Sequence, residues 1–374
     1  MVTGCSDGND RGAGPSASTS ATTMPGPATT TVTAITEIAG CEGLGPVSED
    51  GEVTYVSGGR LFAVRPGGEP RCLLGVPADS EASAWGGKAD RVLLAPVGAR
   101  VGDQTVELAL GPKETAGWSR PTGTSVLVVS DGKLTKRKVD TGAVSDVSFL
   151  ARHDEALYHP SGRHIVSVGV DAVGRYGIFL ASNEGKDVRT VAVAETANRL
   201  SSLSWGPGGT LFFGAEHDGN PSKDRYHIHW RPNDPGQLFK IHLAEGPVAK
   251  VSASPFEEMV SAQTGTCSSG RATQTVDLSK VTEFNEEDVP DAPVVAVDVG
   301  AMDTEPVGWL PGGRLVVLGR PGCDRPGTLW IVPVSPPGSP QRLAQRVETA
   351  AVRIVLPESA GDPFEAGGIE AGEA

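Results

Sequence analysis

Residues 216–235 (EHDGNPSKDRYHIHWRPNDP) form the segment whose side chains are best suited to binding a ligand. Tyr and Trp rings beside Arg and His offer a large contact area with few rotatable bonds and a polar tip. The candidate ligand-binding residues are Arg225, Tyr226, His227, His229 and Trp230. The alternative interpretation is an additional strand, on which the aromatic residues alternate inward and the two histidines face solvent.

Metal binding by the same segment is a weaker hypothesis. His227 and His229 are two residues apart, so they could point the same way along a strand and hold a metal with His217 or Asp218. Calcium requires oxygen ligands, but the glycine of this segment is misplaced for a known calcium-binding loop. The candidate oxygen ligands are Glu216, Asp218, Asn220 and Asp224. We predict neither a metal nor a cofactor.

A group of acid–base side chains lies earlier in the chain and consists of His153, Asp154, Glu155 and His159. Such groups catalyse proton transfer when they converge on a substrate, but in loops they are usually solvated. The sequence contains no GxxxxGKS/T, GxGxxG or HExxH motif for phosphate, dinucleotide or zinc chemistry. We therefore predict no catalytic residues.

The first residues indicate where the protein is located. Val2-Thr3-Gly4-Cys5 resembles a bacterial lipobox, in which the Cys carries the lipid, and this resemblance implies lipidation of Cys5 on the outer face of the cytoplasmic membrane. Only four residues precede Cys5, so we expect a start codon further upstream or a trimmed chain. Residues 6–33 are almost entirely Ser, Thr, Gly, Ala, Pro, Asp and Asn, a composition that favours a flexible tether.

The acidic charge of the chain is concentrated in two segments. The formal net charge is −14, and residues 281–306 and 357–374 contain eight and five acidic residues without a Lys or Arg. We interpret these segments as a solvated loop and a solvated tail. The remaining sequence lacks the basic stripe that nucleic-acid binding requires, so we expect no nucleic-acid partner.

An internal repeat predicts the fold. Six blocks combine an anchor residue, a Pro/Gly turn and an aliphatic run, as in 204–214 (SWGPGGTLFFG) and 308–319 (GWLPGGRLVVLG). A second strand–turn–strand unit follows most blocks, which gives four strands in roughly 40 to 50 residues, the length of a β-propeller blade. The anchors are Trp85, Trp118, Tyr158, Trp205, Ala253 and Trp309, and we expect them in the core.

These blocks resemble the repeat of TolB-like β-propellers, usually W-S-P-D-G followed by an aliphatic or aromatic strand. The resemblance covers about residues 50–356 and implies an all-β propeller in an extracytoplasmic protein. The Asp of the repeat is replaced here by residues such as Ser161, Gly208 and Gly312. The small α/β domain that precedes the propeller in TolB has no counterpart before residue 50, so the partners of TolB are not carried over.

Strand counting favours seven four-stranded antiparallel blades, with six as the alternative. The first unit, residues 52–74, lacks its innermost strand, and residues 349–356 (TAAVRIVL) can supply it from the other end of the chain and close the ring. We therefore expect a lipobox and tether over residues 1–46, a propeller over 47–356 and a disordered acidic tail over 357–374.

Four cysteines remain if Cys5 is lipidated, and an even number in an exported protein favours disulfides. Cys267 and Cys323 each lie twelve residues after the turn proline of their block, so they occupy equivalent loops of adjacent blades. This position favours the pairing Cys267 with Cys323, and Cys41 with Cys72. Free thiols are the alternative.

The combined features predict a monomeric cell-envelope lipoprotein that binds or scaffolds a protein, peptide or glycan. The loops joining the second and third strands share a face with the links between blades, and this face is where ligands usually bind. A propeller hydrolase or lyase acting on an envelope polymer is the competing hypothesis, and a sensor that reports to a membrane partner is a third.

Overall fold

The computed structural model describes most of the chain between residues 40 and 355. All described residues fall in Ile35–Ala374, the second of the two units into which the chain divides. The described ranges are 40–47, 50–76, 80–86, 89–95, 98–101, 104–107, 114–120, 122–193, 197–217, 225–231, 234–242, 248–281, 294–323 and 325–355.

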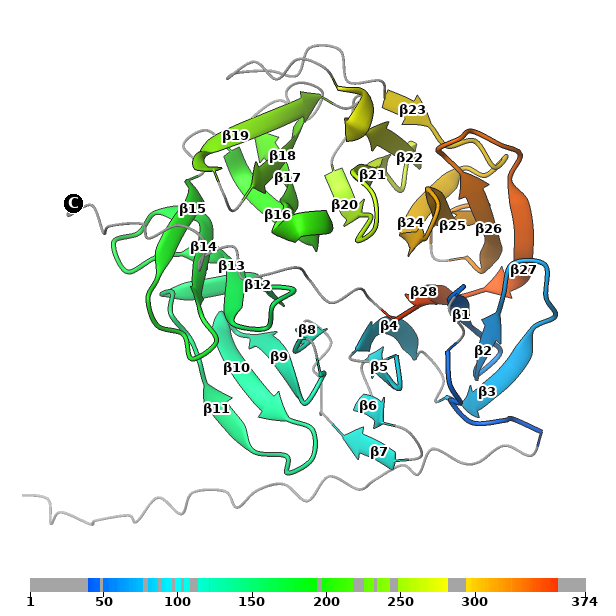
Figure 1. The fold of residues 1–374 in the computed structure, drawn as a ribbon, viewed down its shortest axis with the longest axis horizontal. Coiled ribbons are helices and arrows are strands. Elements are labelled where there is room, and N and C mark those ends of the chain that lie inside the picture. Colours follow the sequence, from blue (N-terminus) through cyan, green and yellow to red (C-terminus); the bar gives the residue numbers. More distant parts are fainter. Residues whose placement is uncertain are drawn as a thin grey trace, which may run out of the picture. The chain divides into compact units, whose positions relative to one another are not determined.

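Antiparallel sheets are arranged around a central axis in these residues (Figure 1). The first sheet, from its innermost strand outward, contains β28 (Thr349–Arg353), β1 (Glu52–Ser57), β2 (Arg60–Val64) and β3 (Arg71–Gly75). The second contains β4 (Glu81–Gly86), β5 (Arg91–Ala95), β6 (Gly98–Val101) and β7 (Gln104–Glu107). The third contains β8 (Thr115–Trp118), β9 (Ser125–Ser130), β10 (Lys133–Lys138) and β11 (Val144–Asp146).

The remaining sheets continue the same pattern around the axis. The fourth contains β12 (Arg152–Tyr158), β13 (His164–Val170), β14 (Tyr176–Ser182) and β15 (Arg189–Val193). The fifth contains β16 (Ala197–Trp205), β17 (Leu211–His217), β18 (Arg225–Arg231) and β19 (Asp234–His242).

The last sheet of the described residues has eight strands. Its first part contains β20 (Val248–Ala253), β21 (Met259–Thr266), β22 (Gly270–Asp277) and β23 (Val294–Ala296), and its second part β24 (Asp303–Leu310), β25 (Arg314–Arg320), β26 (Gly327–Pro333) and β27 (Gln341–Val347). A single parallel pair, Arg271 with Asp303, joins the two parts. The expected all-β architecture is confirmed, and the five four-stranded sheets of the described residues are consistent with the expected blades.

The two ends of the described chain share the first sheet. β28 pairs antiparallel with β1, from Glu52↔Arg353 to Val56↔Thr349. This pairing supplies the innermost strand that the sequence of the first unit lacks, as we expected. It also removes the exposed sheet edges that an open ring would leave.

The repeat anchors lie in the core between neighbouring sheets. Trp85, Trp118, Tyr158 and Trp309 are 7%, 5%, 4% and 2% exposed, and the aliphatic runs that follow the turns are also buried. The turn between β24 and β25 requires glycine at position 313, where φ is +63° and a Cβ would lie 2.5 Å from the Ser335 carbonyl oxygen. The predicted core role is confirmed for these four anchors and for Ala253, whereas Trp205 is only partly buried.

Residues 40–46, which we assigned to the tether, include contacts with the first sheet. Cys41 forms a disulfide with Cys72 on β3, and Leu44 is only 2% exposed. Residues 40–47, which we call the N-terminal arm, therefore pack on the first sheet. An apolar side chain that can be buried and a covalent link account for this difference.

Candidate functional site

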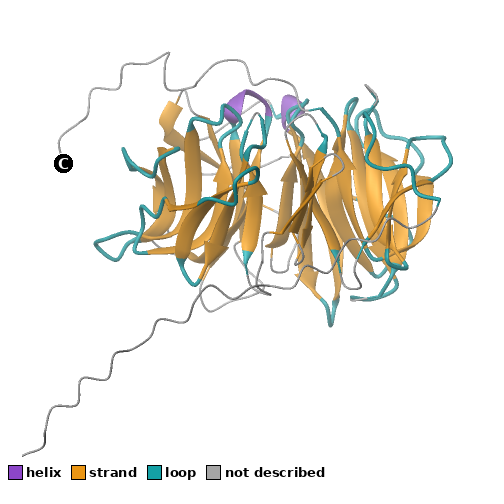
Figure 2. Cartoon of the chain, turned by 90° about the horizontal axis from the view of Figure 1, so that it is seen from below, coloured by secondary structure: helices purple, strands orange, loops and turns teal. Residues whose placement is uncertain are grey.

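The two faces of the ring differ in the connections they carry. The turn face carries the connections between first and second strands. The two 3-10 helices of the described residues, η1 (Pro207–Gly209) and η2 (Leu278–Lys280), lie there, at the upper edge of Figure 2. The opposite face, here called the link face, carries the inter-sheet links and the connections between second and third strands. The sequence predicts that ligands bind at the link face.

A disulfide ties two neighbouring connections of the link face together. Cys267 lies between β21 and β22, Cys323 lies between β25 and β26, and their Cα atoms are 5.6 Å apart. This is the pairing that the repeat predicts. The bond links the two parts of the eight-stranded sheet, so it limits their relative movement at this face.

A cluster of charged side chains lies at the same junction. Arg271 donates from Nε and Nη2 to the two carboxylate oxygens of Asp303, at 2.7 and 2.9 Å, and Asp303 is 1% exposed. The amide of Gln263 adds a contact of 3.3 Å to Asp303. A buried carboxylate needs partners of this kind, because desolvation of an unpaired charge is costly.

Glu305, two residues further along β24, connects the cluster to β20 and β25. It accepts from Lys250 Nζ of β20 at 2.8 Å and from Arg320 Nη1 of β25 at 2.7 Å. Burial alone would raise the pKa of Glu305, but the charges and hydrogen bonds of Lys250 and Arg320 lower it to about 2. The carboxylate is therefore charged at neutral pH and occupied by two cations.

This cluster corrects one prediction from the sequence. We expected residues 281–306 to form a solvated acidic loop, yet Asp303 and Glu305 belong to the innermost strand β24. Their cationic partners Lys250, Arg271 and Arg320 are distant in sequence and were not singled out. The position of both carboxylates shortly before the anchor Trp309 was the signal that could have placed them on a strand.

The acid–base candidates of the fourth sheet do not converge. His153 lies at the start of β12, whereas His159 follows its end. His153 is 1% exposed, its Nε2 accepts from two backbone amides at 3.2 Å, and burial lowers its pKa to about 4. His159 uses Nδ1 for Ser161, whose Oγ lies 2.8 Å away.

The two carboxylates between them are also engaged. Asp154 pairs with Arg152 at 2.9 Å. Glu155 accepts from the backbone amides of Ser202 and Leu203 on β16, at 2.6 and 2.9 Å. Each of these four side chains therefore makes contacts with other described residues of the chain. The four do not converge on a common reaction site.

Ser202 continues the contacts from one innermost strand to the next. Its φ is +61°, in the left-handed region, at a bulge of β16. This conformation turns its amide toward Glu155, while its Oγ accepts from the amide of Val251 on β20 at 2.6 Å. Polar contacts thus connect β12, β16 and β20 in succession.

The nominated ligand-binding residues lie on a strand. Arg225, Tyr226, His227, His229 and Trp230 belong to β18, which pairs with β17 and β19. The strand that the sequence offered as the alternative to a loop over 216–235 is therefore present, and the connection between second and third strands is 218–224. Several β-favouring residues in succession explain the strand. The binding role of these five residues stays a prediction.

The metal hypotheses fall largely outside the described residues. His217 ends β17, whereas Asp218, Asn220 and Asp224 lie in the segment that the structure does not describe. Among the residues that it does describe, no group of three or more His, Cys, Asp or Glu side chains could hold a metal ion. Cys5 also lies outside the described part.

Within the described residues, no helix is long and apolar enough to cross a membrane.

Comparisons with known proteins extend only to the fold. No family model matches the chain, and no curated protein matches it. Among solved structures, tricorn protease aligns with a TM-score of 0.55 at 12% identity, over 84% of this chain and 35% of that one. Oligogalacturonate lyase in complex with manganese aligns with a TM-score of 0.50 at 11% identity, over 76% of this chain and 87% of that one.

The putative TolB from Agrobacterium tumefaciens is also similar, with a TM-score of 0.46 at 15% identity, over 68% of this chain and 93% of that one. Another match is described as a beta-propeller domain, with a TM-score of 0.47 at 12% identity. At these identities the similarities concern architecture alone. The chain has a β-propeller fold, and its function has to be argued from its own residues.

Proposed function

We propose that this protein is an exported lipoprotein of the cell envelope, anchored through Cys5 to the outer face of the cytoplasmic membrane, whose propeller binds a protein, peptide or glycan. The address is supported by the lipobox-like Val2-Thr3-Gly4-Cys5 and the tether-like composition that follows. Two disulfides add support, because such bonds persist mainly in oxidising compartments.

The ring of this proposal has seven blades. The eight-stranded sheet counts as two blades, because β22 and β24 share only the pair Arg271↔Asp303. The other sheets of the described residues have four strands each. A six-bladed count would require one blade of twice the usual size.

The observation that carries the binding proposal is the bracing of the link face. The Cys267–Cys323 bond holds two of its loops, and the paired charges of Arg271, Asp303 and Glu305 lie at the same junction. A rigid scaffold that presents loops loses little conformational entropy on binding. Binding is favoured over catalysis because the described acid–base groups of the fourth sheet are engaged in hydrogen bonds and ion pairs within the chain.

The link face also offers the side chains for a test. Val173, between β13 and β14, and Met302, before β24, are 77% and 63% exposed, the two highest values for large hydrophobic side chains in the described residues. Both can be changed without removing a strand, whereas deleting 216–235 would remove β18. Val144 on the outer strand β11 is 61% exposed and serves as a matched control away from this face.

The test is capture of partners from solubilised membranes by the full chain. We expect the double variant Val173→Glu/Met302→Glu to lose the specific partner, and Val144→Glu to recover as much as the unchanged protein. Equal recovery by both variants would exclude the link face. Release of soluble products from purified envelope polymers by the full chain would instead favour the hydrolase or lyase hypothesis.

Labelling with a fatty acid tests the proposed lipid anchor at Cys5 separately from the binding face. Cells expressing the full-length protein are fed a fatty acid that carries an alkyne, and the protein is isolated and coupled to a dye. We expect label on the unchanged protein and none on Cys5→Ala. Label that persists in Cys5→Ala would contradict lipidation at this residue without bearing on the binding face.

A further inference from the structure

The N-terminal arm is fastened to the outermost strand of the first sheet. The Cys41–Cys72 disulfide joins the arm to β3, with the two Cα atoms 4.7 Å apart. The amide of Glu42 donates to the Cys72 carbonyl at 2.9 Å, and the amide of Gly43 donates to the Leu73 carbonyl at 3.0 Å. One covalent bond, two backbone hydrogen bonds and an exposed ion pair of Glu42 with Arg71, at 3.3 Å, therefore hold this end of the arm.

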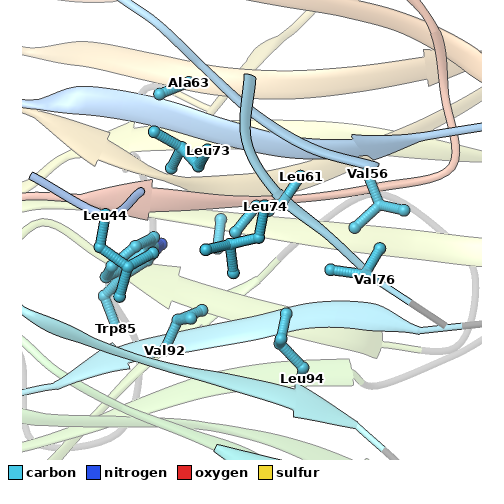
Figure 3. Close-up of a cluster of buried hydrophobic side chains, with 11 residues drawn as sticks. Leu44, Val56, Leu61, Ala63, Leu73, Leu74, Val76, Trp85, Val92 and Leu94 are labelled. Carbon is cyan, nitrogen blue, oxygen red and sulfur yellow. The ribbon is translucent and has the colours of Figure 1, made fainter. Parts of the chain in front are cut away.

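The other end of the arm reaches the seam between the first and second sheets. Leu44 is 2% exposed and packs in a cluster with Trp85 and Val92 of the second sheet (Figure 3). The carbonyl of Gly45 accepts a hydrogen bond from Nη2 of Arg353. The arm thus contributes both an apolar side chain and a polar acceptor to this seam.

Arg353 is the last residue of β28 and is fully buried. Its Nε donates to the Ala89 carbonyl at 3.0 Å, its Nη1 donates to Glu52 at 3.1 Å, and its guanidinium lies 4.4 Å from the centre of the Trp85 ring. Arg353 therefore connects the closing strand to β1, to the second sheet and to the arm. Removing one acceptor from a buried cation is costly.

We propose that the Cys41–Cys72 disulfide is a redox-sensitive lock on the closure of the ring. The disulfide keeps the arm close to the sheet at a high effective concentration. Leu44 therefore remains packed in its cluster, and the Gly45 carbonyl remains hydrogen-bonded to Arg353. Without the disulfide, the arm is held by a few weak contacts and can leave. Water then reaches Arg353, and the pairing of β28 with β1 weakens. The proposal does not depend on a lipid at Cys5.

The chemical step is thiol–disulfide exchange with an external dithiol. One thiolate of the reagent attacks a sulfur of the Cys41–Cys72 bond, forms a mixed disulfide with that cysteine and releases the other as a thiolate. The second thiolate of the reagent then attacks the mixed disulfide and releases the remaining cysteine. Two electrons and two protons pass to the protein, which ends with two thiols, while the reagent ends as its own disulfide. Both cysteines are only half-buried, which leaves the bond within reach of a small reagent.

Amide hydrogen exchange of the full chain, followed by mass spectrometry, tests the lock. We expect Cys41→Ser/Cys72→Ser to speed exchange in β28 and β1 by about tenfold or more, with β12–β15 unchanged. A dithiol should produce the same change in the unchanged protein and no further change in β28 and β1 of this variant. The matched control is Cys267→Ser/Cys323→Ser, whose changes should centre on β21, β22, β25 and β26.

A second variant covers the case in which the double variant does not fold. Leu44→Ala keeps the disulfide but empties the site beside Trp85, so β28 should exchange faster while Cys41 and Cys72 remain oxidised. Unchanged exchange in β28 and β1 after complete reduction, verified by the mass of alkylated Cys41 and Cys72, would overturn the proposal. Equal acceleration of all strands would also overturn it, since that result indicates general destabilisation.

Discussion

His153 should make the stability of the propeller depend on pH in a defined window. Its Nε2 accepts from the amides of Phe149 and Leu150, so Nδ1 carries the proton and faces Ser167 Oγ at 2.8 Å. The ring is therefore buried in its neutral form. Burial lowers the pKa of His153 from 6.5 to about 4, against the opposing effect of nearby Asp146 and Asp154.

The size of the effect follows from that shift. The unfolded chain takes up a proton at this histidine near its ordinary pKa, whereas the folded protein takes it up only near 4, so a falling pH favours the unfolded state. Each pKa unit corresponds to about 1.4 kcal/mol, which gives a full loss of about 3 kcal/mol. By about pH 5, a loss of about 2 kcal/mol is expected, because titration of the folded form has barely begun.

The assay is urea unfolding of the unchanged protein and of His153→Gln, at about pH 7.5 and about pH 5. Glutamine does not titrate. The free energy of unfolding of His153→Gln should therefore fall by about 2 kcal/mol less over this interval than that of the unchanged protein. The comparison removes the contribution of the other histidines, which both proteins share. An identical pH dependence in the two proteins would refute the assignment of His153 as a buried neutral ring.

Two further substitutions test the contacts between innermost strands. The pKa of Glu305 is lowered from 4.5 to about 2, so its contribution to stability is present above pH 4.5 and is lost as the pH falls toward 2. We expect Glu305→Gln to cost about 2 kcal/mol at neutral pH and to remove that acid-dependent loss, as measured by circular dichroism during acid titration. Trp309 is 2% exposed and donates from Nε1 to the Ser252 carbonyl at 2.9 Å, whereas Trp205 Nε1 has no hydrogen-bond partner among the described residues. Trp309→Phe should therefore cost about 2 kcal/mol in urea unfolding and more than Trp205→Phe, and the reverse order would contradict the role of this hydrogen bond.

The parts of the fold that repeat were predictable from the sequence. One short segment, in which an anchor such as Trp309 precedes a Pro/Gly turn and an apolar run, predicts a strand, a turn and the side of the strand that is buried. The first unit lacked one strand and the segment beginning at Thr349 had no partner in its own unit, so the sequence predicted that this segment completes the first sheet. The Cys267–Cys323 pair followed from equivalent positions in two blocks, because a repeat converts sequence offsets into spatial neighbours.

The partners of charged side chains could not be predicted in the same way. Lys250 and Glu305 are 55 residues apart, and Glu155 and Ser202 are 47 apart, so their contacts depend on how neighbouring sheets face each other. An acidic run looks the same in a sequence whether its carboxylates meet water or cations. The sequence also left open whether 225–231 forms a loop or a strand, since polar and aromatic residues suit both, and the structure has the strand.

The contacts between innermost strands also restrict how a binding site in this propeller can be tested. Glu155 holds two amides of the next sheet, and Glu305 holds Lys250 and Arg320, so substituting either carboxylate changes the packing of two sheets as well as the surface charge. A loss of binding in such a variant would not identify a contact residue. Side chains such as Val173 and Met302 lie outside these contacts, so a loss of binding there, with unchanged stability, would locate the interface.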